Sequence, residues 1–251
     1  MGTVEPQVVV LNDGSSIVIW DDIYTNNISA QRLSTTGTWL WATDVQVNSV
    51  DGSAQWPSDP TMGVINGDVI VAWEDERSTD SDIYAQRLDV NGNKVWTADM
   101  AISPDASAGT QYQPVLATDG DGNSYIVWHS YYNQENWGFY AQRLDALGNR
   151  LWSQNVKVSS VLTNRVPLSL ATDGEGNVLV VWRLSIDGRH VDLVGQRLDV
   201  TGGRLWDQEI RINTNDGSTF QESPKTVVGL DGNAFVVWED DREGERNVYA
   251  Q

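Results

Sequence analysis

Short apolar runs alternate with turns rich in Gly, Asn and Asp along the whole chain, and the same order of segments returns about every 55 residues. In each unit, a small apolar segment that follows a proline (strand A), as Val115–Ala117 follows Pro114, leads into a tight turn. Strand B comes next and is apolar on both faces, as in Val69–Ala72, so both of its faces must be covered. Strand C reads Tyr-Ala-Gln-Arg-Leu or a close variant, and strand D alternates apolar and polar residues, which predicts one buried face. No stretch has a sustained helical period, so we expect almost no helix.

Two series of tryptophans mark the repeat. The first series ends strand B and comprises Trp20, Trp73, Trp128, Trp182 and Trp238. The second series lies ten residues after the glutamine of strand C and comprises Trp41, Trp96, Trp152 and Trp206. Four strands of graded burial, repeated at this length, are typical of a β-propeller blade. A parallel β-helix is the alternative, but its coils are usually shorter.

The sequence therefore predicts an all-β β-propeller with five blades of four antiparallel strands, in which the last blade is three-stranded. We expect a single domain over residues 1–251, with strand A lining the channel and strand D at the rim. The expected repeats span residues 6–56, 57–113, 114–166, 167–223 and 224–251.

The fifth unit stops at Gln251, after strand C. Either the chain was cut from a longer one or the last blade has three strands, and we favour the second. We expect this ring to be closed mainly by side-chain contacts between blades five and one. Strand C at Asn247–Gln251 would then be an open edge, which favours a monomer or a weak edge-mediated dimer. Extension by about 17 residues is expected to raise stability.

Composition and charge exclude several classes of binding partner and chemistry. Lys and Arg number 16 against 35 Asp and Glu, so the net charge is −19, which argues against nucleic-acid binding. No apolar run is long enough to insert into a membrane. The absence of cysteine excludes disulfides and thiolate chemistry. The sequence after Met1-Gly2 has no basic or apolar leader, so we expect that a signal peptide is not part of it.

The segment WEDERSTDSDIYAQRLDVNGNKVW (73–96) and the segment WEDDREGERNVYAQ (238–251) resemble a repeat of bacterial and archaeal secreted surface proteins. That repeat belongs to the TolB-like group of β-propellers. The resemblance implies a propeller fold and an extracellular or cell-surface setting. In such a setting, we expect a carbohydrate or a surface protein as the partner. Units three and four depart from the pattern, because His129-Ser130 and Arg183-Leu184 replace its acidic pair.

Acidic pairs follow the first tryptophan in three units: Asp21-Asp22, Glu74-Asp75 and Glu239-Asp240. A ring of carboxylates at one mouth of the channel could bind a ligand, hold Ca²⁺ or supply acid/base pairs. The alternative is structural. Asp75 with Arg77, and Asp240 with Arg242, would form ion pairs within their loops.

Aromatic residues gather in the loops expected at the same end of the propeller. The D–A loops carry Trp56, Tyr112 and Phe220, and the B–C loop of unit three carries Tyr131, Tyr132 and Trp137. Aromatic rings beside polar groups can stack on sugar C–H faces, so we predict ligand binding at these residues and at Asp75 and Asp240. The alternative is that the rings fill gaps between blades.

Asp119, Asp121 and Asn123 place oxygen ligands at alternate positions, as calcium loops do. They form our candidate metal site, and calcium is the one cofactor we expect to be possible. A plain Asx-type hairpin turn explains the same pattern, because the distal glutamate of an EF-hand is absent. No hydrolase, P-loop or zinc-protease motif is present, and no catalytic residue is assigned.

Near-equivalent units give near-equivalent loops, which suit several weak sites acting together. The sequence therefore favours a non-enzymatic extracellular binding or adhesion module, with carbohydrate as the favoured ligand. The alternatives are a glycoside hydrolase on a five-bladed propeller and a ligand-free scaffold. A hydrolase should break the repeat with paired carboxylates, whereas the aromatic loop of unit three adds only Glu135.

Overall fold

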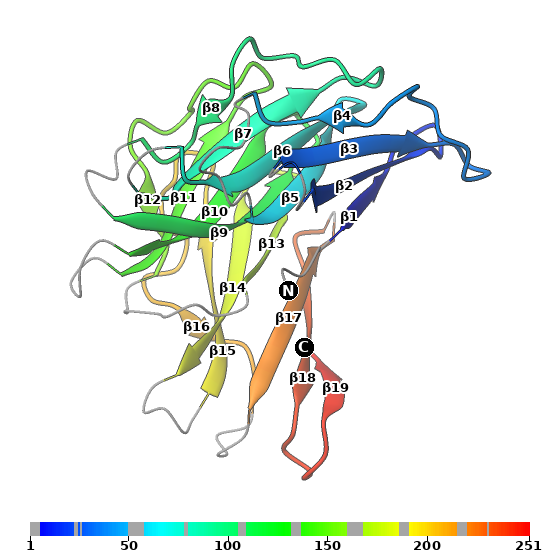
Figure 1. The fold of residues 1–251 in the computed structure, drawn as a ribbon. Helices are drawn as coiled ribbons and strands as arrows, with labels where there is room; N and C mark the ends of the chain where they lie inside the picture. The colour runs from blue at the N-terminus through cyan, green and yellow to red at the C-terminus, as the bar shows by residue number, and fades with distance from the viewer. Residues whose placement is uncertain are drawn as a thin grey trace.

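The structure is a computed structural model that describes residues 6–22, 25, 27–49, 58–77, 80–104, 109–131, 137–159, 168–185, 191–214, 220–229 and 231–251. The described residues contain strands β1 to β19 and no helix, in five antiparallel sheets (Figure 1). No helix of the described residues is long and apolar enough to cross a membrane. The predicted all-β class is confirmed, with four sheets of four strands and a last sheet of three.

Each sheet is one repeat, and its strands follow one another in chain order. Sheet 1 comprises β1 (Gln7–Val10), β2 (Ser16–Asp22), β3 (Asn27–Leu33) and β4 (Val45–Gln46). Sheet 2 comprises β5 (Ser58–Ile65), β6 (Asp68–Asp75), β7 (Asp82–Leu88) and β8 (Met100–Ala101). Sheet 3 comprises β9 (Thr110–Thr118), β10 (Ser124–Tyr131), β11 (Gly138–Leu144) and β12 (Val156–Lys157). Sheet 4 comprises β13 (Leu168–Thr172), β14 (Val178–Ser185), β15 (Val191–Leu198) and β16 (Ile210–Arg211). Sheet 5 comprises β17 (Gln221–Val228), β18 (Ala234–Asp240) and β19 (Asn247–Ala250).

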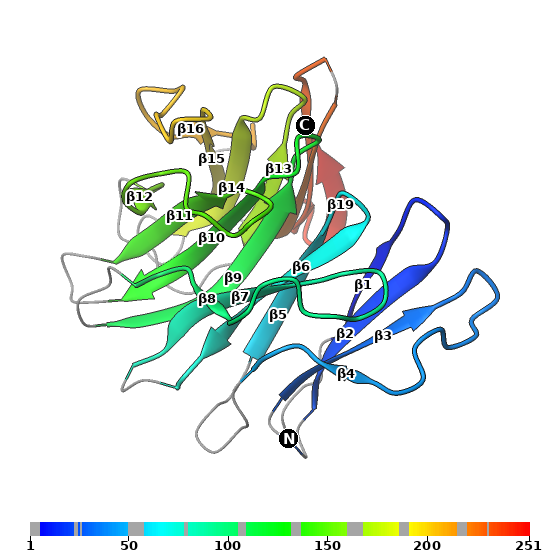
Figure 2. The same cartoon turned by 90° about the horizontal axis from the view of Figure 1, so that it is seen from above.

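The sheets succeed one another around an arc, with sheet 1 and sheet 5 at its two ends (Figure 2). The A strands contact one another in order, β1 with β5, β5 with β9, β9 with β13 and β13 with β17. Among the described residues of the last and first sheets, the side-chain closure that we expected is not seen. Apolar side chains at the two ends of the arc stay exposed, among them Val8 (62%), Val10 (66%), Phe235 (59%) and Val248 (76%).

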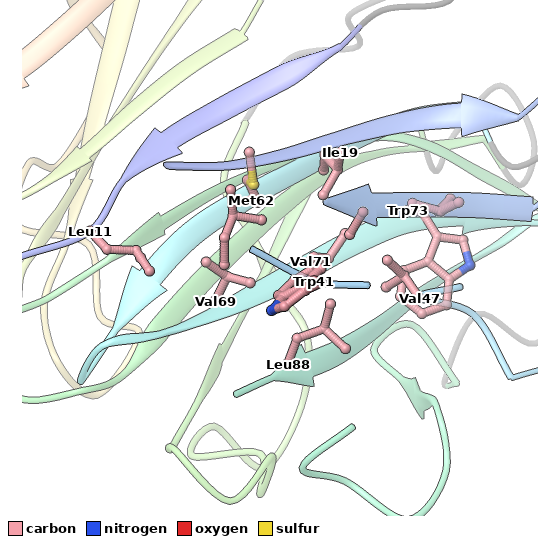
Figure 3. Close-up of a cluster of buried hydrophobic side chains, with 12 residues drawn as sticks. Leu11, Ile19, Trp41, Val47, Met62, Val69, Val71, Trp73 and Leu88 are labelled. Atoms are coloured by element: carbon pink, nitrogen blue, oxygen red, sulfur yellow. The ribbon is translucent and has the colours of Figure 1, made fainter. Parts of the chain in front are cut away.

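The hydrophobic core lies between successive sheets rather than in one central mass. Between sheets 1 and 2, Ile19 and Trp41 of the first pack with Val71 and Trp73 of the second (Figure 3). Trp128 and Trp182 occupy the equivalent places at the next two interfaces. The first tryptophan of each sheet from the second onward is therefore the large buried side chain that joins it to the sheet before.

A second recurrent contact holds the end of each complete sheet. The strand-C glutamine spans ten residues to the second tryptophan, donating from Nε2 to its carbonyl and accepting its backbone N–H at Oε1. The pairs are Gln31–Trp41, Gln86–Trp96, Gln142–Trp152 and Gln196–Trp206. This contact explains why the glutamine and the tryptophan recur together, and it assigns the glutamine a structural role.

Strand A begins earlier than expected in three sheets. β5, β9 and β17 start before their proline, not after it, and each carries a bulge there. Gln113 and Ser223, the residues before two of these prolines, take left-handed backbone angles with φ of 52° and 53°. Because proline cannot donate to the ladder, the bulge lets pairing with strand B continue past it.

Candidate functional site

The B–C and D–A segments meet at one end of the sheets. The Phe220 N–H donates to Asp241 Oδ1 at 2.9 Å, which joins the D–A segment of sheet 5 to its B–C turn. The Gln111 N–H donates to the Ser81 carbonyl at 2.7 Å, which joins β9 to the B–C turn of sheet 2. The acidic and aromatic candidates that the structure describes therefore share one end of the molecule, which we call the B–C end.

Two of the predicted aromatic side chains lie together on sheet 3. Tyr131 ends β10 and is 40% exposed, and Trp137 is half-buried just before β11. Their ring centroids are 4.8 Å apart and the rings are tilted by 59°, so they present two faces at an angle. Tyr132 and Trp56 lie outside the described residues.

Tyr112 sits in a different setting from the one expected for a loop residue. It lies within β9 opposite His129, is 8% exposed, and stacks on the His129 ring at 5.2 Å. His129 in turn meets the Phe139 ring edge-on at 4.5 Å, which extends the aromatic packing inward. Phe220 remains 48% exposed.

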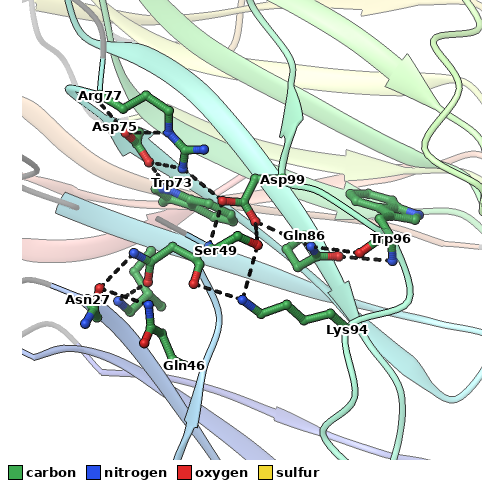
Figure 4. A network of polar contacts seen from close by, with 12 residues as sticks. Asn27, Gln46, Ser49, Trp73, Asp75, Arg77, Gln86, Lys94, Trp96 and Asp99 are labelled. Carbon is green, nitrogen blue, oxygen red and sulfur yellow. Dashed lines mark hydrogen bonds and ion pairs between the residues drawn. The ribbon is translucent and has the colours of Figure 1, made fainter. Parts of the chain in front are cut away.

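Asp75 is fully buried in a compact polar network (Figure 4). It accepts from Trp73 Nε1, from the Arg77 backbone N–H and from Arg77 Nε, each at 2.9 Å. The Arg77 guanidinium also pairs with Asp99 at 2.9 Å and lies 4.0 Å from the centre of the Tyr84 ring. The carboxylate thus holds the start of the B–C turn to the end of its own strand.

Sheet 5 repeats this unit. Asp240 accepts from Trp238 Nε1 at 3.1 Å and from the Arg242 N–H at 2.9 Å, and it pairs with the Arg242 side chain. Arg242 lies 4.0 Å from the centre of the Tyr249 ring. Both carboxylates therefore form the ion pairs within their loops that the structural alternative predicts. A direct role for Asp75 or Asp240 in ligand binding stays a prediction.

The Asp240 unit makes stability sensitive to acid. Burial raises the pKa of Asp240, but hydrogen bonds from Arg242 and Trp238 outweigh it and bring the pKa down to about 2, from 3.8. The ionised carboxylate therefore stabilises the fold above about pH 4, and this contribution is lost as the pH falls toward 2. We expect Asp240→Asn to lower the urea midpoint at pH 7 and to flatten its decline between pH 4 and pH 2.

The matched control for this prediction is Asp121→Asn, which removes an exposed carboxylate from a hairpin turn. In this variant, the urea midpoint should fall between pH 4 and pH 2 as steeply as in the unmodified protein. If the urea midpoints of the Asp240 and Asp121 variants fall equally steeply with pH, the role given to Asp240 is contradicted.

The candidate calcium residues form a closed hairpin turn. Asp119 Oδ1 accepts the N–H groups of Asp121 and Asn123 at 3.0 and 2.8 Å, and Oδ2 accepts from Asn123 Nδ2 at 2.9 Å. Arg143 also pairs with this carboxylate. The described residues contain no cluster of three or more His, Asp or Glu side chains suited to a metal ion. These contacts are those of an Asx-type turn. Calcium binding there stays a prediction.

One charged cluster at the B–C end was missed by sequence reasoning. Arg183 pairs with Glu222 at 3.0 Å across sheets 4 and 5, and Arg246 reaches Glu222 and Glu239 at 3.4 and 3.5 Å. A signal existed, because Arg183 stands where other units carry an acidic residue. Its partner could not be foreseen without the packing of the two sheets.

The comparisons with known proteins concern the fold. No protein-family model matches the chain, and no curated protein does. The chain is similar to an endo-arabinase from Bacteroides thetaiotaomicron at 14% identity and a TM-score of 0.54, over 100% of this chain and 94% of that one. The fold is a β-propeller. We therefore call the five sheets blades 1 to 5.

Two further solved structures extend the likeness. An α-L-arabinofuranosidase from Lactobacillus brevis matches at 12% identity and a TM-score of 0.53, over 98% of this chain and 89% of that one. An ulvan lyase, a polysaccharide lyase, matches at 11% identity and a TM-score of 0.60, over 98% of this chain and 63% of that one. Similarity at such identities concerns the fold alone. The resemblance to secreted surface repeats stays a prediction.

Proposed function

We propose that this protein binds carbohydrate at the B–C end of blade 3, without cleaving it. The observation that carries the proposal is the Tyr131–Trp137 pair. An aromatic side chain that is 40% exposed stands at the end of β10, with a second aromatic ring 4.8 Å away. Such a pair is suited to sugar rings, whose C–H faces stack on aromatic faces while the hydroxyls stay near water.

Packing beneath the pair supports a preformed site. His129 is buried next to Ser130 in β10, held between Tyr112 at 5.2 Å and Phe139 at 4.5 Å. The end of strand β10 is therefore held by aromatic packing. Tyr131 is the first residue after this packing whose side chain is exposed. A rigid aromatic side chain loses little conformational entropy on binding, which favours affinity.

The known structures with this fold support a polysaccharide as the ligand. Those named above are an endo-arabinase, an α-L-arabinofuranosidase and an ulvan lyase. Polysaccharides of this kind lie outside cells. They agree with the secreted setting that the sequence resemblance implies, and we include an extracellular location in the proposal.

The state of the acidic residues favours binding over hydrolysis. A glycoside hydrolase needs two carboxyl groups that face the sugar at a defined separation. The carboxylate oxygens of Asp75 and Asp240 instead accept hydrogen bonds from tryptophan and arginine side chains inside their own blades. A hydrolase is therefore the second candidate, supported only by the names of the fold neighbours.

A glycan array, run with and without calcium, identifies the ligand. We then expect the double variant Tyr131→Ala, Trp137→Ala to lose binding at least about tenfold while the melting temperature changes little, since stacking accounts for most of the contact. Trp39→Ala is the matched control, because Trp39 is also exposed (66%) but lies on a C–D turn at the opposite end. It should bind as the unmodified protein does.

Three results would overturn the proposal. Absence of binding to any glycan would favour the ligand-free scaffold. Release of reducing sugar from a bound polysaccharide would establish the hydrolase. If the double variant fails to fold, the single variants Tyr131→Phe and Tyr131→Ala decide. Normal binding by both would show that Tyr131 is not part of the site.

A further inference from the structure

The sequence contains two Asn-Gly pairs, Asn66-Gly67 and Asn91-Gly92, and both asparagines are exposed in turns of blade 2. An asparagine followed by glycine can deamidate without an enzyme. The backbone nitrogen of the glycine attacks the side-chain carbonyl carbon of the asparagine, which closes a succinimide ring and releases ammonia. Water then opens the ring to aspartate or isoaspartate. Glycine favours this attack because it has no side chain to hinder the approach.

In the pair Asn91-Gly92, the nitrogen that would attack is held by a hydrogen bond. The Gly92 N–H donates to the Asp89 carbonyl at 2.9 Å. The Asp89 side chain fixes the same turn, since its Oδ1 accepts the N–H groups of Asn91 and Asn93, each at 2.8 Å. Attack at Asn91 must therefore break the first bond and rotate a backbone that the other two hold.

The turn of Asn91 is also seated against the neighbouring blade. A Cβ on Gly92 would come within 2.9 Å of Val45 and 3.1 Å of Trp41, both of blade 1. Trp41 Nε1 donates to the Val90 carbonyl at 3.1 Å. Packing and hydrogen bonds thus oppose the same backbone rotation.

The pair Asn66-Gly67 is the two-residue hairpin turn between β5 and β6, closed by the pairing of Ile65 with Asp68. Asn66 and Gly67 have φ of 52° and 89°, the left-handed angles of a type I′ turn. Among the residues that the structure describes, no acceptor receives the Gly67 N–H. Attack by this nitrogen breaks no hydrogen bond of its own.

Charge also distinguishes the two turns. Asp68, next to Gly67, is neutralised by Arg87, which contacts it at 2.8 and 3.0 Å. The donors that the structure describes for the Asp89 carboxylate are neutral amide groups of its own turn. An unneutralised negative charge opposes the loss of the amide proton that precedes attack. The barrier is therefore lower at Gly67 than at Gly92.

We propose that Asn66 is a self-modification site, at which the Gly67 nitrogen displaces ammonia and water then yields aspartate and isoaspartate. The bond from the Gly67 nitrogen to the Asn66 side-chain carbon forms as the bond from that carbon to the amide nitrogen breaks. The Gly67 amide proton leaves with the ammonia, nothing is oxidised or reduced, and water is the only co-reactant. Asn91 shares the Asn-Gly sequence and is protected by its turn.

The modification changes the contact between blades 2 and 3. A Cβ on Gly122, in the turn between β9 and β10, would come within 2.5 Å of Asn66 Nδ2, so the amide lies against that turn. Asp121 in the same turn is exposed, and a new carboxylate at residue 66 repels it. Isoaspartate also lengthens the backbone of a turn that the Ile65–Asp68 pairing closes. Both products therefore weaken this contact.

The test incubates the folded full chain at mildly alkaline pH and follows both asparagines by peptide mapping with mass spectrometry. Asn66 should convert faster than Asn91 by at least about threefold, the rate factor that a hydrogen bond of ordinary net strength supplies. In the chain unfolded in guanidinium chloride, the two rates should be similar, because glycine follows both asparagines. Asp89→Ala should speed conversion of Asn91 and leave Asn66 unchanged.

Melting temperatures test the effect on the blades. Asn66→Asp should melt below the unmodified protein, and the double variant Asn66→Asp, Asp121→Asn should recover part of the loss, because the repelling charge is removed. Equal melting of Asn66→Asp and the unmodified protein overturns the weakened contact. Equal rates at Asn66 and Asn91 in the folded chain overturn the modification site. A preference for Asn66 that persists unchanged on unfolding also overturns it, because the turns would then not set the rates.

Discussion

Replacement of Trp128 with alanine is expected to lower the free energy of unfolding by about 3–5 kcal/mol. The side chain is 1% exposed and lies in the cluster between blades 2 and 3, with Ile70 and Ile83 of blade 2. Its Nε1 donates to Gln111 Oε1 at 2.8 Å, so alanine leaves both a cavity and an unpaired buried amide oxygen. Urea denaturation followed by circular dichroism measures the loss.

Trp39→Ala is the control, since this tryptophan is 66% exposed on a turn. It should change the free energy of unfolding by less than about 0.5 kcal/mol, as surface substitutions usually do. A loss below about 1 kcal/mol for Trp128→Ala would show that blades 2 and 3 do not depend on this contact.

The fold could be predicted from the sequence because the same strand positions are buried in successive repeats. Strand B of each of blades 2, 3 and 4 lies between two neighbouring blades, so both of its faces must be apolar, as at Val178–Trp182. The paired recurrence of glutamine and tryptophan also had a local cause, the contact over ten residues that each pair makes. Local contacts of this kind leave a regular spacing in the sequence.

Features that depend on neighbouring strands could not be predicted in the same way. A proline indicated the start of strand A, yet β9 begins at Thr110 because a bulge at Gln113 carries the pairing past Pro114. The bulge places Tyr112 opposite His129. Without it, Tyr112 was expected in a loop.

The same limit applies to the candidate site. Tyr112 and Tyr131 look equivalent in the sequence, as aromatic residues at the border of polar loops. Only the structure separates them, because His129 stacks on Tyr112 while Tyr131 remains 40% exposed. The Arg183–Glu222 pair likewise joins residues of different blades, and no local spacing signals it.

The second large effect is expected at Asp75. Asp75→Leu should lower the free energy of unfolding by about 3 kcal/mol, because it leaves the Trp73 indole N–H and part of the Arg77 guanidinium without their acceptor. Arg77 keeps its ion pair with Asp99 at 2.9 Å, which limits the loss. Urea denaturation at pH 7 measures it.

Blade 4 supplies the control for this prediction, because it lacks the carboxylate naturally. Leu184 stands at the position of Asp75, and no acceptor for Trp182 Nε1 exists among the described residues. The double variant Asp75→Leu, Arg77→Ile copies this unit, which carries Ile186 at the second position. It also removes the ion pair of Arg77 with the buried Asp99, so we expect it to be less stable than Asp75→Leu alone by at least about 1 kcal/mol. If the double variant is instead as stable as the single one, the contacts of Arg77 with Asp99 and Tyr84 do not hold the B–C turn, and the buried carboxylate is its main support.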